Sequence, residues 1–598
     1  MNHESFSIQN FPSSASSLPA FASLVGGEGL YEIASVFVIC SDSPSPPTSP
    51  IHHITGQLTS ITNPAAITNS YEYDGFLPLK ETWAGNVSGN ITRTFNNAFQ
   101  LASVSVNGGT AIPYTYDNDG LLTNVDGMTL ARNSSNGLLT GSTLGSVTDT
   151  YAYNSFGEVS NYTAAYPAGL SCQIGYTRDS IGRITGKTEA INGITTTWGY
   201  SYDQAGRLIQ TTKNGDLWAG YGYDSNGNRT SKTTSTQTIT GTYDAQDRLL
   251  AYGNYTYTYT ANGELASKTN TDTSETTAYT YDVLGNLRTV LLPDGTQIDY
   301  IVDGRNRRVG KKVDGVLQRQ WIYDGQLRPV AELDGTGALV SQFVYATHIN
   351  IPDYIVKGAT TYRVITDHLG SLRFVIDTAT GAIAQRMDYD DWGNAITNTN
   401  ADFTPFGFAG GMYDNQTKLV RFGARDYDAE TGRWTAKDPI GFMSGQINLY
   451  EYSFNDSINI YDPRGLAGCI ADCVRTLRTA RKGWTTQRFG FSLAGGAAGV
   501  AVGFYVGMSI SASPVTVWGS PVFIGGCAVG GAALGYFGIY EGWYGFEELA
   551  ARGAAAQRFR ECMSQCNCGQ VSTDLIRNVF NNEWPGGWLV SFLEWLSE

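Results

Sequence analysis

The chain has 598 residues and a formal net charge of -15, which is too long for one ordinary domain unless it is built from repeats. Residues 467–598 hold nine Lys/Arg and nine Asp/Glu, so the whole acidic excess lies on residues 1–466. An acidic body argues against a nucleic-acid-binding surface, because phosphate contacts need clustered Lys and Arg.

Residues 1–70 carry few signs of regular structure. MNHESFSIQNF has no positively charged n-region, which argues against a Sec signal peptide. Residues 40–70 are rich in Ser, Pro, Thr and Asn, a composition typical of irregular chain. We therefore predict an irregular leader or linker over 1–70. The alternative is that the chain is the end of a longer product whose earlier repeats are missing.

A short pattern, aromatic-x-Tyr-Asp-x-x-Gly-x-Leu, recurs from about residue 71 to 325. Clear copies are YEYDGFL at 71–77, YTYDNDGLL at 114–122, YSYDQAGRL at 200–208 and YTYDVLGNL at 279–287. The aligned aspartates are Asp203, Asp224, Asp244, Asp282, Asp303 and Asp324. Their intervals are 20 or 21 residues, except for one of 38 that contains a degenerate copy with Thr260 in the Asp position. This period indicates a repeat architecture.

Each repeat has the features of a β-hairpin. Tyr-x-Tyr places both rings on one face of a strand, because side chains alternate with period 2. Asp followed by x-x-Gly supplies a tight turn with a residue free to adopt positive φ. Single hairpins are marginal in water, so the units are expected to stack edge to edge into a long sheet. The aligned tyrosines would then be framework residues; a sugar-binding ladder is the alternative.

Residues 421–466 contain two Asp-Pro-x-Gly sequences, DPIG at Asp438–Gly441 and DPRG at Asp462–Gly465. Each is a type I turn signature by itself. The composition changes directly after the second copy, because residues 467–598 are Gly/Ala-rich and apolar and hold six of the eight cysteines. Paired aspartates at such a boundary suggest a body, a cutting point and a separate C-terminal segment.

These motifs resemble the YD repeats of the Rhs family, which are shared with toxin-complex B and C components and with teneurins. YRVITDHLGSLRFVIDTATG at 362–381 resembles the TDHLGSxR segment of that family, and 421–466 resembles its repeat-associated core domain. The resemblance implies a mainly β fold, with YD repeats over 71–360 spiralling into a hollow shell. The core domain would cover 361–466, and a separate small α-helical domain would cover 467–598.

The resemblance also implies an aspartyl-protease-like site that cuts the chain once. Carried over by motif, the catalytic residues would be Asp438 and Asp462, and the cut would fall between Leu466 and Ala467. Two neighbouring carboxyls share one proton, so one can take a proton from water while the other polarises the carbonyl. Arg464 stands where the family commonly has an apolar residue, which alters the surroundings of the second turn.

Arg433, in the TGRW segment, matches an Arg of the family motif. The resemblance assigns it to the catalytic group, where it would orient a carboxylate or the scissile carbonyl. The alternative is a simple surface ion pair with Asp428 or Glu430.

Residues 467–598 contain no histidine and no motif that indicates a cofactor or a metal site. They do contain a run from Phe489 to Tyr540 without any charged residue, divided by Pro514 and Pro521 into two segments long enough to span a bilayer. The glycines at four-residue spacing are Gly495, Gly499, Gly503 and Gly507 in the first segment, and Gly526, Gly530, Gly531 and Gly535 in the second. Such spacing favours close helix packing in lipid and predicts a membrane-inserting hairpin over 489–540. A buried Gly-rich hairpin of a soluble domain is the alternative.

Two cysteine pairs flank this run. Cys469 and Cys473 precede it and Cys562 and Cys566 follow it, each pair four residues apart and thus on one helix face. Disulfides Cys469–Cys566 and Cys473–Cys562 would join the base of the hairpin. Reduced thiols and a thiolate metal site remain alternatives.

Together these features predict an Rhs-type toxin delivered to the cell surface or outside by a non-Sec route. Its shell would hold a C-terminal cargo that permeabilises a target-cell membrane after self-cleavage. The expected partners are that membrane, a cognate immunity protein and a secretion-system or N-terminal shell component, with no nucleic acid. The alternatives are a YD-repeat adhesion protein anchored by the apolar hairpin, and an enzymatic toxin of unrecognised fold.

Overall fold

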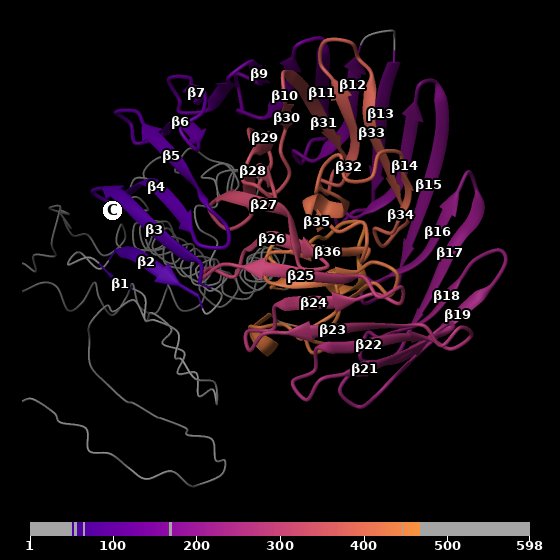
Figure 1. Ribbon diagram of the computed structural model, residues 1–598. Coiled ribbons are helices and arrows are strands. Elements are labelled where there is room, and N and C mark those ends of the chain that lie inside the picture. The colour runs from indigo at the N-terminus through magenta and orange to yellow at the C-terminus, as the bar shows by residue number, and fades with distance from the viewer. Residues whose placement is uncertain (1–50, 53–56, 64–65, 167–169, 445, 467–598) are drawn as a thin grey trace, which may run out of the picture. The chain divides into compact units, whose positions relative to one another are not determined.

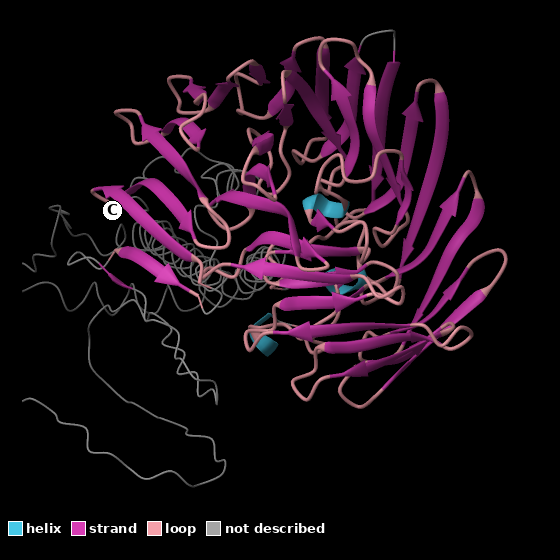
Figure 2. Ribbon diagram, viewed as in Figure 1, coloured by secondary structure: helices cyan, strands magenta, loops and turns pink. Residues whose placement is uncertain are grey.

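The computed structural model describes residues 51–52, 57–63, 66–166, 170–444 and 446–466. Within these ranges the chain is built almost entirely of antiparallel strands and turns, with three short 3-10 helices (Figures 1 and 2). The mainly β class predicted from the repeats is therefore confirmed. The expected helical domain at 467–598 lies outside the described residues.

The first 34 strands form one sheet. In its first half they are β1 (Ile51–His52), β2 (Leu58–Thr62), β3 (Thr68–Asp74), β4 (Leu77–Ala84), β5 (Gly89–Phe95), β6 (Leu101–Val106), β7 (Ile112–Tyr116), β8 (Leu122–Val125), β9 (Met128–Arg132), β10 (Leu139–Leu144), β11 (Val147–Tyr153), β12 (Val159–Tyr166), β13 (Leu170–Arg178), β14 (Ile184–Ile191), β15 (Ile194–Tyr202), β16 (Leu208–Lys213) and β17 (Asp216–Tyr223). In its second half they are β18 (Arg229–Thr233), β19 (Thr238–Tyr243), β20 (Leu249–Tyr252), β21 (Tyr255–Tyr259), β22 (Leu265–Asn270), β23 (Thr276–Tyr281), β24 (Leu287–Leu291), β25 (Gln297–Val302), β26 (Arg308–Val313), β27 (Val316–Asp324), β28 (Arg328–Asp334), β29 (Leu339–Val344), β30 (Tyr354–Lys357), β31 (Thr360–Thr366), β32 (Leu372–Asp377), β33 (Ile383–Tyr389) and β34 (Ala395–Asn398).

The long sheet is a simple meander, in which each strand pairs antiparallel with the next strand along the chain. Two expectations about domain boundaries need correction. Strands β1 to β3 occupy part of the segment expected to be irregular up to residue 70, because Leu58–Thr62 (LTSIT) is rich in β-branched residues and pairs with β3. The expected boundary at 360–361 falls inside the β30–β31 hairpin, so the ladder continues across it.

The repeat turns have the geometry that the Asp-x-x-Gly pattern predicts. In the 203–207 turn, the Gly206 N–H donates to the Asp203 carbonyl at 3.0 Å and Gly206 has φ of +88°. The Asp203 carboxylate accepts the Arg207 N–H at 2.9 Å. In the degenerate copy the Thr260 hydroxyl oxygen accepts the Gly263 and Glu264 N–H groups, each at 3.2 Å, so it replaces the carboxylate.

The second tyrosine of the Tyr-x-Tyr pattern joins one hairpin to the hairpin before it. The hydroxyl of Tyr202 donates to the Ile184 carbonyl at 2.6 Å and that of Tyr223 to the Leu208 carbonyl at 2.7 Å. The same bond is made by Tyr73, Tyr116 and Tyr153, and by three tyrosines at equivalent positions that lack the first tyrosine of the pattern, Tyr243, Tyr323 and Tyr345. These tyrosines therefore have the framework role that the sequence predicts for them.

Late strands of the sheet pack against early ones. Trp83 of β4 and Ile91 of β5 share a buried core with Ile322 of β27 and Val375 of β32, and β5 lies beside β27 (Figure 1). Further along, β12 to β17 share a core with β31 and β32, and Trp392 belongs to it. Burial on both faces explains why β27 and β32 are apolar over consecutive residues.

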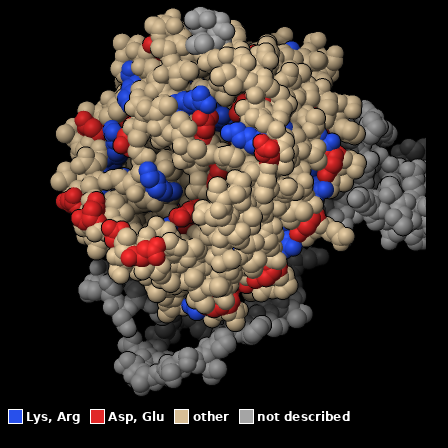
Figure 3. Space-filling model, turned by 90° about the vertical axis from the view of Figure 1, so that its right-hand side faces the viewer, with Lys and Arg blue, Asp and Glu red and all other residues tan. Residues whose placement is uncertain are grey.

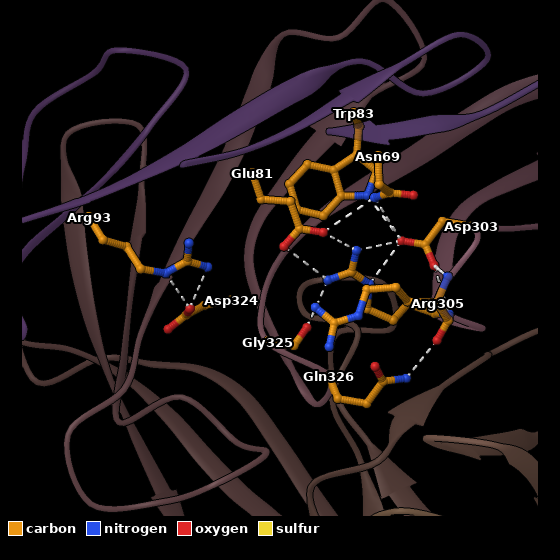
Figure 4. Close-up of polar contacts among 10 residues, drawn as sticks. Asn69, Glu81, Trp83, Arg93, Asp303, Arg305, Asp324, Gly325 and Gln326 are labelled. Atoms are coloured by element: carbon orange, nitrogen blue, oxygen red, sulfur yellow. Dashed lines mark hydrogen bonds and ion pairs between the residues drawn. The ribbon is translucent and has the colours of Figure 1, made fainter. Parts of the chain in front are cut away.

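A buried polar cluster ties the early and late strands together (Figure 4). We call Asn69, Glu81, Trp83, Asp303 and Arg307 the seam network. The Arg307 guanidinium lies between the Glu81 and Asp303 carboxylates, and its Nη2 is 2.6 Å from Asp303 Oδ2. The Trp83 indole N–H donates to the same oxygen at 3.1 Å. The bonds from Glu81 to Arg307 and from Trp83 to Asp303 each join residues more than 200 positions apart, so they hold the early strands against the late ones.

A second sheet of four short strands follows: β35 (Met412–Tyr413), β36 (Leu419–Phe422), β37 (Arg425–Asp428) and β38 (Arg433–Trp434). The 3-10 helices are η2 (Phe408–Gly410), η3 (Gly441–Ser444) and η4 (Ser453–Asn455). Aromatic side chains of this region form their own core, in which the rings of Tyr427 and Tyr452 lie 4.2 Å apart. On the face shown in Figure 3, Lys and Arg lie beside Asp and Glu over a mostly uncharged surface.

Candidate functional site

The two Asp-Pro-x-Gly turns meet at one arginine. Nη2 of Arg425 is 2.9 Å from Asp438 Oδ2 and 3.4 Å from Asp462 Oδ2. All three side chains are at most 2 % exposed. The structure thus brings together the two aspartates that the sequence paired, although 24 residues separate them.

Both aspartates also stabilise their own turns, as the turn signature predicts. The Asp438 carboxylate accepts the Ile440 N–H at 3.0 Å, and the Asp438 carbonyl accepts the Gly441 N–H at 2.9 Å. The Asp462 carboxylate accepts the Arg464 N–H at 3.3 Å. One oxygen of each carboxyl is held by its turn, and the other oxygen faces Arg425.

Residues 462–466 are seated on the hairpin between β36 and β37. The Ala424 N–H donates to the Arg464 carbonyl at 2.8 Å, and Nε of Arg425 donates to the Gly465 carbonyl at 2.6 Å. Gly465 has φ of +63°, and a Cβ there would stand 2.3 Å from the Phe422 carbonyl oxygen. Only glycine fits this position, and the chain therefore passes close to Arg425 just before Leu466.

The segment between the two turns is fastened to repeat turns. The Asn448 amide donates to Asn228 Oδ1 at 2.7 Å, and the Tyr450 hydroxyl donates to the Gly263 carbonyl at 2.6 Å. Near its end, the Ile184 N–H donates to Asn459 Oδ1 at 2.7 Å. The repeats therefore fix the position of the segment that carries both aspartates.

The electrostatics of the pair favour one shared proton. Burial raises the pKa of Asp462 to about 6; the charge of Asp438 adds to this rise, while Arg425 and the Leu466 N–H oppose it. Burial also raises the pKa of Asp438, with Arg425 again opposing it. One arginine cannot balance two buried negative charges, so the pair keeps a proton at pH values below about 6.

Arg433 lies elsewhere. Its Nη1 is 2.9 Å from Asn228 Oδ1, its Nη2 contacts the Asp247 carbonyl, and its guanidinium lies 4.8 Å from the centre of the Tyr243 ring. It is 5 % exposed, so it is not a surface arginine paired with Asp428 or Glu430 either. Arg433 anchors the core segment to the repeats, and no contact joins it to Asp438 or Asp462 among the described residues.

Arg425 is the residue that sequence reasoning missed. It follows the Gly423–Ala424 turn in FGARDY, a local pattern that predicts only a hairpin. Its partners are 13 and 37 residues away, and no local signal marks an arginine that will be buried between them. A charged residue in a strand flanked by aromatic positions was the one available hint.

Several predicted site residues lie outside the described residues. These are Ala467, the four paired cysteines and the eight glycines of the apolar run from Gly495 to Gly535. The described residues include no apolar helix of the length that a membrane span requires. Nor does this part of the chain bring three or more His, Cys, Asp or Glu into an arrangement that could hold a metal ion.

Comparison with known proteins places the described region in context. The family model described as Teneurin YD-shell matches residues 52–458. Mouse Teneurin-3 is 27% identical over 292 residues, which is 46% of this chain and 10% of that protein. Double-stranded DNA deaminase toxin A of Burkholderia cenocepacia (strain H111) is 29% identical over 333 residues, covering 50% of this chain and 22% of the toxin.

A solved structure of TcdB2-TccC3-TEV shares the fold, with a TM-score of 0.54 and 16% sequence identity over 69% of this chain and 24% of that one. The structure of TcdB2-TccC3-Cdc42 gives a TM-score of 0.53 and 17% identity over the same share of this chain. This chain therefore spans a quarter or less of the length of these relatives and structural neighbours.

Proposed function

This chain belongs to the Teneurin YD-shell family, and from its similarity to a bacterial toxin as well we propose that it is a toxin component whose repeats enclose a C-terminal cargo. The cargo, residues 467–598, is released by one self-cleavage between Leu466 and Ala467. The observation that carries this proposal is the buried pair Asp438 and Asp462 on Arg425, next to residues 462–466.

The chemistry follows from the shared proton. The ionised carboxyl takes a proton from a water molecule as the water oxygen attacks the Leu466 carbonyl carbon, and the protonated carboxyl polarises the carbonyl oxygen. The C–N bond to Ala467 then breaks and its nitrogen leaves as an amine after accepting a proton from the pair. The products are a Leu466 carboxylate and an Ala467 amine. No step needs a metal or another cofactor.

The substrate is already in place, because it belongs to the same chain. The Gly465 carbonyl is bonded to Arg425, and the Arg464 N–H donates to the Asp462 carboxyl. Covalent attachment removes the cost of a bimolecular encounter. The same contacts remain in the N-terminal product, so the new C-terminus stays in the site and blocks a second substrate. We therefore propose a single turnover.

A long sheet that packs on itself and a Gly-rich apolar cargo support the rest of the proposal. The enclosed cargo would be two apolar helices, over 489–540, that permeabilise a target-cell membrane. Enclosure would keep their apolar surface from water until delivery. The chain would act outside the producing cell after a non-Sec route, and an immunity protein, a delivery component and the target membrane would be its partners.

The first test compares the full chain with Asp438→Asn and Asp462→Asn by intact mass under denaturing conditions. We expect two fragments that meet at Leu466/Ala467 in the unmodified chain and one uncut chain in each variant. An intact unmodified chain that is folded would overturn the self-cleavage proposal and favour a YD-repeat adhesion protein.

The cargo proposal needs a separate measurement. Dye leakage from liposomes is compared between the cut full-length chain and the uncut Asp462→Asn chain, at the same concentration and before and after mild unfolding of the repeats. We expect leakage only from the cut chain, after unfolding. No leakage from either chain in any condition would leave cleavage intact as a finding and reject the membrane-permeabilising cargo.

A further inference from the structure

We propose that Trp434 is a positioning residue for self-cleavage, because its indole ring holds the Arg425 guanidinium in the orientation that lets one nitrogen reach both aspartates. This inference rests on the proposed self-cleavage. Trp434 touches neither the aspartates nor the scissile bond in the contacts of the described residues, so its action would pass through Arg425.

The contact between the two side chains is close. Cζ of Arg425 lies 4.1 Å from the centre of the Trp434 ring. The polar bonds of Arg425 go to the Gly465 and Leu449 carbonyls and to the two aspartates. An arginine that stacks on an indole face and bonds at its edges has its plane fixed as well as its position.

Trp434 is itself held rigidly. It is 2 % exposed, and its backbone N–H donates to the Tyr450 carbonyl at 3.0 Å. Its ring meets the rings of Phe422, Tyr427 and Tyr452 at 5.9, 5.8 and 5.4 Å, each nearly edge-on. A platform packed on several sides cannot follow Arg425 if that side chain moves, so it restrains the guanidinium.

The indole N–H group gives no reason for a tryptophan at position 434. Nε1 of Trp434 has no hydrogen-bond partner among the described residues, and a buried unpaired donor is unfavourable. The ring face, in contrast, makes the contact with Arg425. We infer that the face is the useful part of this side chain.

The charged and titratable groups around Arg425 define a readout. They are the carboxyls of Asp438 and Asp462, with the Tyr452 phenol beside Asp462. Arg425 lowers the pKa of both carboxyls against the effect of burial. If Arg425 tilts away, both pKa values rise, and the pH range in which the pair holds one proton moves upward.

The experiment uses Trp434→Leu, which removes the aromatic face, and Trp434→Phe, which keeps an aromatic face with a weaker attraction for cations. Full-length chains are pulse-labelled in cell-free synthesis and diluted into buffers from pH 4.5 to 8.5, and the cut fraction is followed in time. Trp83→Leu is the matched control, because Trp83 is also buried and lies 4.9 Å from the Arg307 guanidinium, in the seam network (Figure 4).

We expect Trp434→Leu to cut about 30-fold more slowly, the equivalent of about 2 kcal/mol for a desolvated cation–π contact. The acid limb of its pH–rate profile should move to higher pH. Trp434→Phe should show a smaller change in the same directions, and Trp83→Leu should lose stability but keep the rate and profile of the unmodified chain.

Two results would overturn the inference. One is a Trp434→Phe chain that cuts with the rate and the pH–rate profile of the unmodified chain. This variant keeps the packing and so remains informative if Trp434→Leu does not fold. The other is slow cutting with an unchanged profile, which would indicate a purely structural role. Failure of the unmodified chain to cut would instead reject the proposed function, and the two failures are therefore distinguishable.

Discussion

Arg425 lies beside two buried carboxyl groups, so its single positive charge cannot balance both of them when they are ionised. The sharing of one cation by Asp438 and Asp462 sets the protonation state of the pair. Arg433, an arginine of the neighbouring strand, is equally buried but bonds to amides and carbonyls of the repeats. Two buried arginines of the same region therefore have different roles, because their guanidinium groups bond to different partners.

The first prediction separates these roles. Arg425→Gln removes the cation that bonds to both carboxyls and to the Gly465 carbonyl, so it should abolish cleavage. Arg433→Gln should reduce stability but leave cleavage intact, because its partners belong to the repeats. Intact mass after purification measures the first effect and thermal unfolding the second. Cleavage lost in Arg433→Gln but kept in Arg425→Gln would contradict this assignment.

Asp391, which lies away from the site, is another carboxyl group whose pKa is raised by burial. It is 6 % exposed and accepts the Tyr221 hydroxyl at 2.7 Å. Burial, with the charge of Asp390 adding to it, raises the pKa of Asp391 to about 6. Asp390, in contrast, has Lys232 at 3.0 Å. The folded state is therefore more stable with Asp391 neutral than with Asp391 ionised.

The second prediction follows from the sign of that shift. Because the folded-state pKa is raised, the stabilisation from protonated Asp391 is complete below the ordinary Asp pKa and is lost as pH rises through about 6. Asp391→Asn should thus raise the free energy of unfolding at pH 8, by about 3 kcal/mol at most, and give no gain at pH 4. Asp390→Asn, which breaks an ion pair, should destabilise at pH 8. Urea titrations at both pH values decide between these outcomes.

At the scale of elements, the hairpin is the unit that the sequence predicts most clearly. The carboxylate of Asp203 bonds to the Arg207 N–H, and its charge pairs with the Arg207 guanidinium at 2.7 Å. Thr260 fills the same place with a hydroxyl. The turn therefore needs an oxygen acceptor at this position more than it needs a charge.

The third prediction tests that requirement. Asp203→Ala removes the acceptor and should cost about 1–2 kcal/mol of unfolding free energy, as the loss of a capping side chain does. Asp203→Thr should cost less than half as much, because a hydroxyl can accept the same N–H. Chemical denaturation of the two variants in parallel measures the difference. Equal losses would show that the charge of Asp203 is what matters.

At the scale of the whole described region, contacts between distant hairpins replace a single central core. The seam network joins β3 and β4 to the turn after β25 through Arg307, Glu81 and Asp303 (Figure 4). Arg207 and Asp203 have the same four-residue spacing, but their side chains are 23% and 22% exposed. The same local motif is a partly buried ion pair within one repeat and a fully buried contact between distant strands in another.

The fourth prediction compares these two arginines. Arg307→Met leaves two buried carboxylates without their cation and should cost about 3–5 kcal/mol, with faster amide exchange in β3 to β5. Arg207→Met, the matched control at a pair that is partly open to solvent, should cost about 1 kcal/mol. Urea unfolding and hydrogen exchange measure both. Similar losses in the two variants would show that the seam network does not hold the layers together.

Part of the fold could be predicted because its signals are local. The Asp-x-x-Gly spacing, the Tyr-x-Tyr alternation and the repeat period each act within a few residues, and the structure confirms the hairpins they predict. The strands before residue 70 were missed because Leu58–Thr62 (LTSIT) lacks the turn motif and its polar composition is typical of linkers. Pairing with β3, a contact between segments, is what makes it a strand.

The mainly β class, the repeating hairpin and the two Asp-Pro-x-Gly turns follow from the amino-acid sequence alone, because each depends on backbone preferences of neighbouring residues. Which arginine contacts the paired aspartates depends on how distant segments pack against each other. Arg425 reaches Asp438 and Asp462 because the chain end is seated on the β36–β37 hairpin, while Arg433 is drawn to Asn228 and Asp247. Burial, which sets the proton on the pair, is likewise a property of packed segments and not of any motif.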